Sequence, residues 1–260
     1  MKLLDGRDVA GFIKQRHVQV AAGLAVQPRL AIIRSADNEA ANRYLKLKAD
    51  YGADIGAAVD IYVEAPDTLL DRIARLNADP TVTGIIIQLP LPNPELTAQA
   101  VAAVAPVKDV DGLGPHSPFE AATPKAALWL LAAYGIEPHG RIAVIGQGRL
   151  VGKPLADRLE ASGHEVVRVD IRTKDLGAVT RQADILFTGT GQEHLIKSNM
   201  VKHGAVLVDT GSPRYEFEPA LYERDDLAIT PNPGGVGPMT VASLFDNLLI
   251  AAQRQARKGK

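Results

Sequence analysis

The chain has 260 residues, enough for one large α/β domain or two smaller ones with a substantial core. Its 29 lysines and arginines nearly balance its 30 aspartates and glutamates, which argues against a nucleic-acid-binding surface. Without cysteine it has no disulfides, thiolate metal sites or thiol nucleophiles. The charged amino terminus is not typical of a signal peptide, and no apolar run approaches the ~20 residues of a membrane span. We therefore expect a cytoplasmic protein that has no membrane partner.

The first half of the chain alternates between helical and strand patterns. Strands are predicted at residues 29–34, 58–63 and 83–88, and helices at 6–25, 39–51 and 67–77. The strand at 83–88 is apolar enough to be buried on both faces, as in a parallel sheet. This alternation predicts right-handed βαβ units.

A second series begins after residues 114–123, where Gly, Pro and Ser gather. Helices are predicted at 125–134, 150–161 and 240–250, and strands at 141–145, 165–169, 185–187, 205–208 and 226–230. The fold class is therefore α/β, with two lobes that each contain a sheet.

The run from Pro231 to Thr240 is the most distinctive segment. Its three prolines fix φ, and Gly234, Gly235 and Gly237 permit dihedrals and close approaches that a Cβ would block. We expect a rigid loop that joins a strand to a helix. Such a cluster can also be a tight connection that serves folding alone.

Three glycines, Gly146, Gly148 and Gly152, follow a buried strand at the start of a helix. Exposed amides and the helix dipole at such a place can hold a pyrophosphate. The GxGxxxG spacing is only moderately specific. Asp170 ends the next strand, 24 positions after Gly146, where a Rossmann fold places the acid that binds a ribose hydroxyl. A helix cap is the alternative role for Asp170.

Tyr44 and Lys48 are four residues apart and share one helix face, so a ring and an amine could flank a flat substrate. A solvated surface lysine is the plainer alternative. Gln88 ends a buried strand, where open α/β sheets bind ligands, unless the backbone satisfies its amide. If Gln88 reaches Lys48, its carbonyl could hold the amine, and burial would lower the lysine pKa.

Lys108-Asp-Val-Asp-Gly112 offers two carboxylates, Asp109 and Asp111, in a loop. No third acid or histidine follows at a metal-binding spacing, so no metal is expected. A carboxylate here suits a ligand with paired N–H donors.

These motifs together resemble the methylenetetrahydrofolate dehydrogenase/cyclohydrolase family, in order and at similar separations. They are Tyr44 with Lys48, Gln88-Leu-Pro-Leu-Pro92, Lys108-Asp-Val-Asp-Gly112, Gly146 to Pro154, and Pro233-Gly-Gly-Val-Gly-Pro-Met-Thr240. The match spans nearly the whole chain, and its two proline-rich strings are highly specific together.

The resemblance implies an enzyme that oxidises 5,10-methylenetetrahydrofolate with a nicotinamide cofactor and hydrolyses the methenyl product to 10-formyltetrahydrofolate. It also implies a homodimer and two domains flanking a cleft. Residues 1–118 would form the folate-binding catalytic domain, with a helix at 240–260 packing back on it. Residues 119–239 would form a Rossmann-type dinucleotide-binding domain with a parallel sheet.

Carried onto this sequence, Lys48 would be the catalytic acid/base, Gln88 its tuning partner, Tyr44 the ring that stacks on folate, and Asp111 the carboxylate that holds the pterin. Leu89, Pro90, Pro233, Gly234 and Gly235 would also contact the substrate. The expected cofactor-binding residues are Gly146, Gln147, Gly148, Arg149, Val151, Gly152, Asp170, Arg172, Thr190, Gly191, Gly235, Gly237 and Thr240.

We expect NAD as the cofactor, with NADP as the alternative. Gln147 and Ile171 stand where the family has an Arg and a Ser that hold the 2′-phosphate, and Asp170 would repel that phosphate. Arg172 could neutralise it. Strand alternation is expected to point Arg168 away from Asp170.

Three other functions stay open on the sequence. The chain could have dehydrogenase activity only, or be a non-catalytic nucleotide- or folate-binding module, although Lys48, Gln88 and Asp111 are all present. Another two-lobed Rossmann oxidoreductase acting on a small carboxylic acid would leave the Gln88–Pro92 string unexplained.

Overall fold

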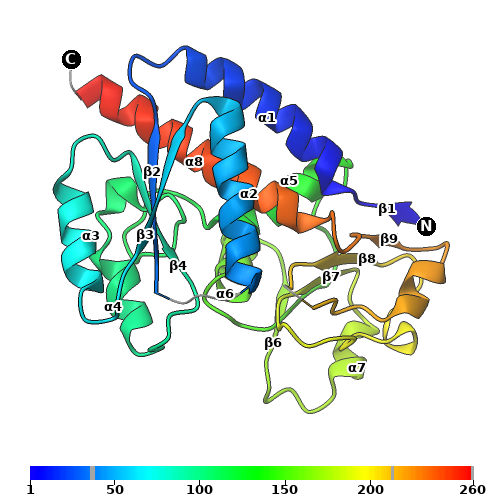
Figure 1. Cartoon of the computed structure of the whole chain (residues 1–260). Helices are drawn as coiled ribbons and strands as arrows, with labels where there is room; N and C mark the ends of the chain where they lie inside the picture. Colours follow the sequence, from blue (N-terminus) through cyan, green and yellow to red (C-terminus); the bar gives the residue numbers. More distant parts are fainter. Residues whose placement is uncertain (36–38, 212–213, 259–260) are drawn as a thin grey trace. The chain divides into compact units, whose positions relative to one another are not determined.

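Figure 1 shows the computed structural model of the chain, which describes residues 1–35, 39–211 and 214–258. The chain forms two compact units. One comprises Met1–Ala10 and Thr123–Thr240, and the other comprises Gly11–Ala122 and Val241–Lys260. We call them the six-stranded unit and the three-stranded unit, after the parallel sheets that their described residues form.

In the three-stranded unit, β2 (Arg29–Arg34) lies between β3 (Ala58–Val63) and β4 (Gly84–Gln88). Both outer strands run parallel to β2, as the strand and helix alternation predicts. The helices of this part of the chain are α1 (Gly6–Ala22), α2 (Glu39–Ile55), α3 (Leu69–Ala78), α4 (Leu96–Ala103) and α8 (Val236–Lys258), with the 3-10 helix η1 (Pro106–Lys108).

Two contact regions form the core of the three-stranded unit. Alternate residues of β2 and β4 pack with α3 and α4, where Ile33, Ile73 and Ile85 are fully buried. Phe245 of α8 stacks on Tyr51 of α2 with 4.9 Å between the ring centroids. The unit therefore includes a helix that follows the other unit in sequence.

In the six-stranded unit the strand order is β1-β9-β8-β7-β5-β6, and all pairs are parallel. The strands are β1 (Lys2–Leu3), β5 (Ile142–Ile145), β6 (Val166–Val169), β7 (Ile185–Thr188), β8 (Val206–Asp209) and β9 (Ala228–Ile229). The helices are α5 (Ala122–Ala133), α6 (Gly152–Ala161) and α7 (Leu176–Thr180), with the 3-10 helices η2 (Ser198–Met200) and η3 (Pro219–Glu223). Leu186, Leu207 and Phe217 lie in its buried core.

The structure differs from the sequence-based expectations at three points. The run Pro231–Thr240 is only partly a loop, because α8 begins at Val236 and so includes Gly237, Pro238 and Thr240. Proline is tolerated there because the first turn of a helix has no partner for its missing N–H. The hydrophobic periodicity of the sequence did not predict β1, α4 or α7. Residues 1–10, expected in the first domain, group with the six-stranded unit, because β1 pairs with β9.

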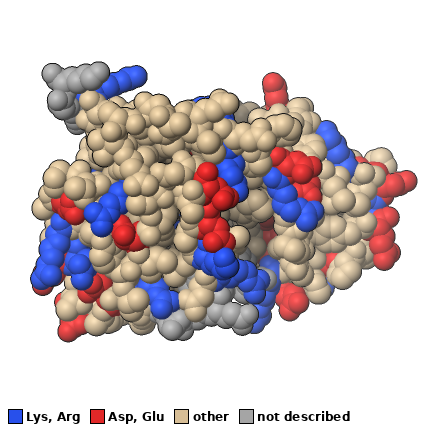
Figure 2. All heavy atoms as spheres, turned by 45° about the horizontal axis from the view of Figure 1, so that its top comes forward, with Lys and Arg blue, Asp and Glu red and all other residues tan. Residues whose placement is uncertain are grey.

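The charged side chains are distributed without large one-sign patches on the face shown in Figure 2. Lys and Arg alternate there with Asp and Glu, in keeping with the balanced composition. Among the described residues, no helix combines the length and apolar character needed to cross a membrane.

Candidate functional site

The three-stranded unit brings Lys48 and Gln88 together. Lys48 lies on α2, and Gln88 is the last residue of β4. The buried Lys48 Nζ donates a hydrogen bond of 3.0 Å to Gln88 Oε1, while Gln88 Nε2 donates to the Leu89 carbonyl oxygen at 3.1 Å. The second contact orients the amide so that its oxygen faces the amine. Lys48 is therefore a buried, partnered lysine and not a solvated one.

Asp111 reaches the same region through the chain that follows η1. An isolated parallel bridge pairs Asp109 with Ile85 of β4, so the segment runs beside the strand that ends in Gln88. Asp109 Oδ2 accepts from the Gly114 amide at 2.7 Å and fixes the loop. The turn after Asp111 requires Gly112, which has φ of 72° and where a Cβ would lie 2.6 Å from the Glu120 carbonyl carbon.

Burial sets the charge states of Lys48 and Asp111. Desolvation lowers the pKa of Lys48, and the nearby Asp111 carboxylate opposes this shift. Desolvation raises the pKa of Asp111 to about 6, and the Lys48 charge opposes this. An amine with a lowered pKa is suited to proton transfer near neutral pH. The two groups form an electrostatically coupled pair in which each favours the ionised form of the other.

The other predicted substrate contacts of this unit lie close in sequence to the pair. Tyr44 is half-buried on α2, one turn before Lys48. Leu89, half-buried, and Pro90, exposed, directly follow Gln88 at the end of β4. Each of the three residues therefore keeps some surface exposed to solvent.

The glycine loop of the six-stranded unit, residues 146–152, allows close backbone approach at the start of a helix. Gly146 has φ of 89°, and a Cβ there would lie 2.8 Å from the Gly189 oxygen. A Cβ on Gly152, the first residue of α6, would lie 1.6 Å from the Gly146 oxygen. The helix start thus approaches the loop as closely as backbone allows, which fits a pyrophosphate held at a helix amino terminus. A Cβ on Gly148 would meet nothing within 4 Å.

The sheet register gathers the predicted cofactor residues at one edge. Ile145, the last residue of β5, pairs with Val169 of β6 and Thr188 of β7. Gly146, Asp170 and Gly189, which follow these three strands, therefore lie side by side at the carboxyl edge, where open α/β sheets bind ligands. The half-buried Gln147 and the exposed Arg149 belong to the loop, and Val151 is the N-cap of α6.

A buried carboxylate that the sequence analysis missed holds the next loop. Glu216 is 0% exposed, and its Oε1 accepts from the amides of Thr190 and Gly191, each at 2.7 Å. Burial raises the pKa of Glu216, and these bonds oppose the shift. Its neighbours Tyr215, Phe217 and Glu218 match no ligand-binding motif, so no local signal could have identified it.

Arg168 and Arg172, each two residues from Asp170 in sequence, are both paired with carboxylates. Arg172 Nη2 donates to Asp170 Oδ2 at 2.6 Å, and this bond lowers the pKa of Asp170. Arg168 Nη1 donates to Oε1 of Gln147, in the glycine loop, at 3.4 Å. Strand alternation does not by itself separate Arg168 from Asp170, because residues two apart in a strand share a face; the guanidinium is held instead by Asp157 and Glu160 of α6.

The Pro-Gly segment belongs to the six-stranded unit. A Cβ on Gly235 would lie 2.6 Å from the Pro231 oxygen, and a Cβ on Gly6 would lie 2.0 Å from the Gly235 oxygen. The segment is thus fixed by contacts with its own backbone and with the start of α1. Pro233, Gly234 and Gly235, predicted to contact substrate, lie in this unit and not in the unit of Lys48.

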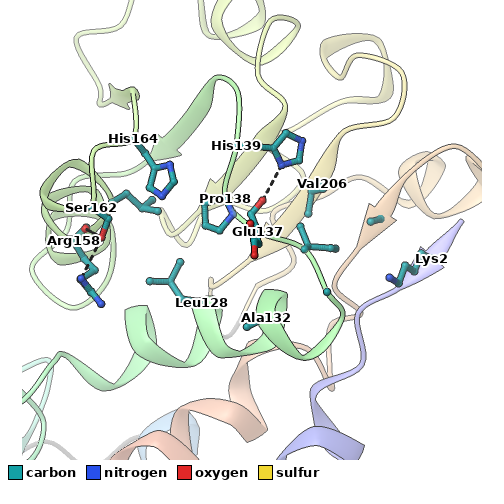
Figure 3. A pocket seen from close by; sticks show the side chains of 14 residues that line it. Lys2, Leu128, Ala132, Glu137, Pro138, His139, Arg158, Ser162, His164 and Val206 are labelled. Atoms are coloured by element: carbon teal, nitrogen blue, oxygen red, sulfur yellow. Dashed lines mark hydrogen bonds between the residues drawn. The ribbon is translucent and has the colours of Figure 1, made fainter.

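A cavity of about 900 Å³ also lies in the six-stranded unit, and Figure 3 shows it from close by. His139, His164 and Arg158 line it, together with Val206 and Ala228, where β8 and β9 begin. It is therefore at the amino-terminal edge of the sheet. Its lining includes no predicted site residue. Among the described residues there is no cluster of three or more potential metal ligands.

Comparisons with known proteins identify a family for both parts of the chain. The catalytic-domain model of tetrahydrofolate dehydrogenase/cyclohydrolase matches residues 4–111, and the NAD(P)-binding-domain model of the same family matches residues 121–256. The bifunctional protein FolD of Wolinella succinogenes is 39% identical over 279 residues, covering 97% of each chain.

Solved structures show the same relationship. The bifunctional FolD enzyme of Campylobacter jejuni superposes with a TM-score of 0.90 at 34% identity, covering 98% of this chain and 99% of the other. The Trypanosoma brucei enzyme, complexed with NADP cofactor and inhibitor, has a TM-score of 0.90 at 28% identity and 98% coverage of both chains. By both its domain models and its full-length relatives, this chain belongs to the tetrahydrofolate dehydrogenase/cyclohydrolase family.

Proposed function

We propose that Lys48, Gln88, Tyr44 and Asp111 carry the folate chemistry of this enzyme and that NAD is its preferred cofactor. The enzyme is a methylenetetrahydrofolate dehydrogenase and methenyltetrahydrofolate cyclohydrolase that uses a nicotinamide cofactor and acts on tetrahydrofolate derivatives. The hydrogen bond between Lys48 and Gln88 is the observation that carries the assignment of the residues.

The cyclohydrolase step needs a group that moves protons while water adds to an electrophilic carbon. The methenyl product is already a cation, so its hydrolysis needs no metal. Lys48 is suited to proton transfer because burial lowers its pKa, and Gln88 holds its amine by one hydrogen bond. The same pair argues against an enzyme with dehydrogenase activity alone and against a non-catalytic module.

Substrate positioning falls to Asp111 and Tyr44. An ionised Asp111 can accept two N–H bonds from the pterin edge, and Tyr44 can stack on a planar ring system. The bond network of Asp109 and the turn at Gly112 support this role, because they fix the loop that carries Asp111. Orientation of this kind supplies much of the rate of a hydride transfer.

The nicotinamide cofactor accepts the hydride, and the protein's part is to hold it in the carboxyl-edge site of the six-stranded unit. The glycines Gly146 and Gly152 leave room for the pyrophosphate beside α6. The amides of Thr190 and Gly191 are held in place by Glu216. Gly235, Gly237 and Thr240 complete the proposed set in the same unit.

The preference for NAD rests on Asp170. Its carboxylate stays ionised because the bond from Arg172 lowers its pKa, so it can accept from ribose hydroxyls and repels a 2′-phosphate. Arg172 is already engaged by Asp170 and is not a dedicated phosphate ligand. From the family resemblance we further propose a cytoplasmic homodimer.

Two measurements test this function. Purified protein with methylenetetrahydrofolate should give steady-state turnover, seen as near-ultraviolet absorbance, with at least one nicotinamide. No turnover by folded protein with either cofactor would refute the activity.

The cofactor choice is tested by kcat/KM for NAD and NADP at one ionic strength, in wild type and in Asp170→Ser. We expect wild type to favour NAD and the variant to gain about tenfold or more with NADP, the size of one charge-assisted bond. A wild-type preference for NADP would count against the role of Asp170.

A further inference from the structure

The outer face of α6 carries a set of ion pairs that the proposed mechanism does not use. Arg168 of β6 donates from Nε to Glu160 Oε1 at 2.9 Å, and from Nη2 to Glu160 Oε2 at 2.7 Å and to Asp157 Oδ1 at 2.6 Å. Both carboxylates lie on α6, one turn apart, and raise the pKa of Arg168 above its usual range. We call Arg168, Asp157 and Glu160 the arginine clamp.

The clamp contacts the glycine loop of the proposed cofactor site. The third donor of the guanidinium, Nη1, contacts Gln147 in the glycine loop at 3.4 Å, and Gln147 Nε2 donates to the Val144 oxygen at 2.9 Å. Arg168 is also two residues before Asp170, which directly follows β6. Every donor nitrogen of the Arg168 guanidinium therefore has a partner, on α6 or in the glycine loop.

The charges of the clamp with Lys153, and those of Asp170 with Arg172, cancel. In the clamp, two carboxylates face Arg168, and Lys153 adds a second cation through a bond of 2.6 Å to Asp157 Oδ2. Beyond it, Asp170 and Arg172 form a neutral pair. A 2′-phosphate brings up to two negative charges and needs uncompensated donors, whereas a 2′-hydroxyl does not.

We propose that the arginine clamp is a second determinant of cofactor specificity: Asp157 and Glu160 hold Arg168 against α6 and so withhold a guanidinium from the 2′-phosphate of NADP. This deepens the proposed function, since it assumes a dinucleotide at the carboxyl edge. Asp157 and Glu160 are positioning residues, because they act on the cofactor through Arg168.

The test is the variant Asp157→Asn/Glu160→Gln, which keeps the shape of both side chains and removes their charge. Freed from its ionised partners, Arg168 should raise kcat/KM for NADP by about tenfold or more, through KM and not kcat, while NAD use changes less than about threefold. Adding Arg168→Gln to this variant should abolish the gain. This third substitution distinguishes the effect of Arg168 from that of Lys153, which also loses its ion pair with Asp157 in the double variant.

The control for net charge is Glu137→Gln/Glu165→Gln, which removes two exposed carboxylates of the same unit that lie outside α6. It should leave the NADP to NAD ratio of kcat/KM within about twofold. An equal gain in this control would mean that bulk charge, and not the clamp, sets the ratio, and would overturn the proposal. Binding of NADPH, followed by its fluorescence, should give the same order of variants.

The outcomes separate the clamp from the cofactor preference. If wild type favours NAD but the double variant gains nothing with NADP, the clamp is refuted and the preference stands. If wild type favours NADP, the preference fails, and Arg168→Gln alone decides on the clamp. The clamp predicts less than about threefold change in NADP use for that variant, and a larger loss would show that Arg168 already binds the phosphate.

Discussion

The two proposed sites of this enzyme are built by opposite means. In the three-stranded unit, a lysine and an aspartate are buried and shift each other's pKa, so the role proposed for this site depends on the charge states of side chains. In the six-stranded unit, Gly146 and Gly152 allow the loop and the start of α6 to come into backbone contact. The carboxylate of Glu216 accepts hydrogen bonds from the amides of Thr190 and Gly191 and so fixes their position. Proton transfer needs a tuned side chain, whereas holding a diphosphate needs shape.

The two kinds of site should therefore fail differently. Removing one functional group from the site of the three-stranded unit should abolish its chemistry without changing its shape. Adding one methyl group to a glycine of the six-stranded unit should prevent cofactor binding without changing any charge. A glycine-to-alanine substitution at Gly146 or Gly152 that lowered hydrolysis as much as the dehydrogenase reaction would show that this division is wrong.

The largest effect is expected for Lys48→Met, which keeps the stem and removes the amine. Hydrolysis of methenyltetrahydrofolate should fall about 10²-fold or more, as for loss of a general acid/base. The loss of methenyl absorbance, corrected for the spontaneous reaction, measures it. Lys46→Met is the matched control, because Lys46 lies on the same helix, exposed and paired with Asp50. Wild-type hydrolysis by Lys48→Met would disprove its role.

Gly152→Ala should have the next largest effect, on the dehydrogenase alone. Its Cβ would lie 1.6 Å from the Gly146 oxygen, so loop and helix must move apart. A shift of that size should lower kcat/KM for the nicotinamide about 10²-fold. Hydrolysis, measured in the same preparation, should stay within about threefold of wild type. Gly11→Ala, where a Cβ would meet nothing within 4 Å, controls for the loss of a glycine.

The smallest effect is a pH dependence of folate binding. The pKa of Asp111 is about 6, so binding through its carboxylate should weaken below that pH, by up to about tenfold per unit. The affinity for an unreactive folate analogue, measured by fluorescence between pH 5 and 8, would show this. In Lys48→Met the transition should move to higher pH, because the lysine charge lowers the pKa of Asp111. Affinity that is flat across this range would remove Asp111 from pterin binding.

The same shift affects stability with the opposite sign. The folded state raises the pKa of Asp111 from 3.8 to about 6, so folding favours the protonated form. The resulting contribution to the free energy of unfolding is fully present below pH 3.8 and is lost as the pH rises through about 6. Folate binding and folding stability therefore change in opposite directions over the same interval.

The elements that could be predicted were those with strong local patterns. The near-continuous apolar runs at β2, β4 and β5 indicate strands buried on both faces, and all three are present. The spacing of Tyr44 and Lys48 likewise follows from helical periodicity. A β-strand of two residues such as β1 is too short to show an alternation of polar and apolar side chains. It exists because β9 offers it a partner more than 200 residues away in sequence.

The side chains that the sequence did not predict act through the fold. Glu216 follows residues 212 and 213, which lie outside the described residues, and nothing nearby resembles a binding motif. It reaches Thr190 and Gly191 through contacts distant in sequence, since its neighbour Phe217 pairs with Ile196 in an isolated parallel bridge. The position of Arg168 depends on Asp157 and Glu160 of α6, which strand periodicity alone does not include.

The position of α8 also constrains how the protein is made. Synthesis delivers β2, β3 and β4 within the first third of the chain, yet Phe245 and Leu248, which pack against Tyr51 and close to Gly84, are translated near its end. Until they leave the ribosome, the three-stranded sheet presents an unfilled apolar face. The six-stranded unit, by contrast, has all but its edge strand β1 within residues 123–240. The unit encoded first is therefore the one completed last during biosynthesis.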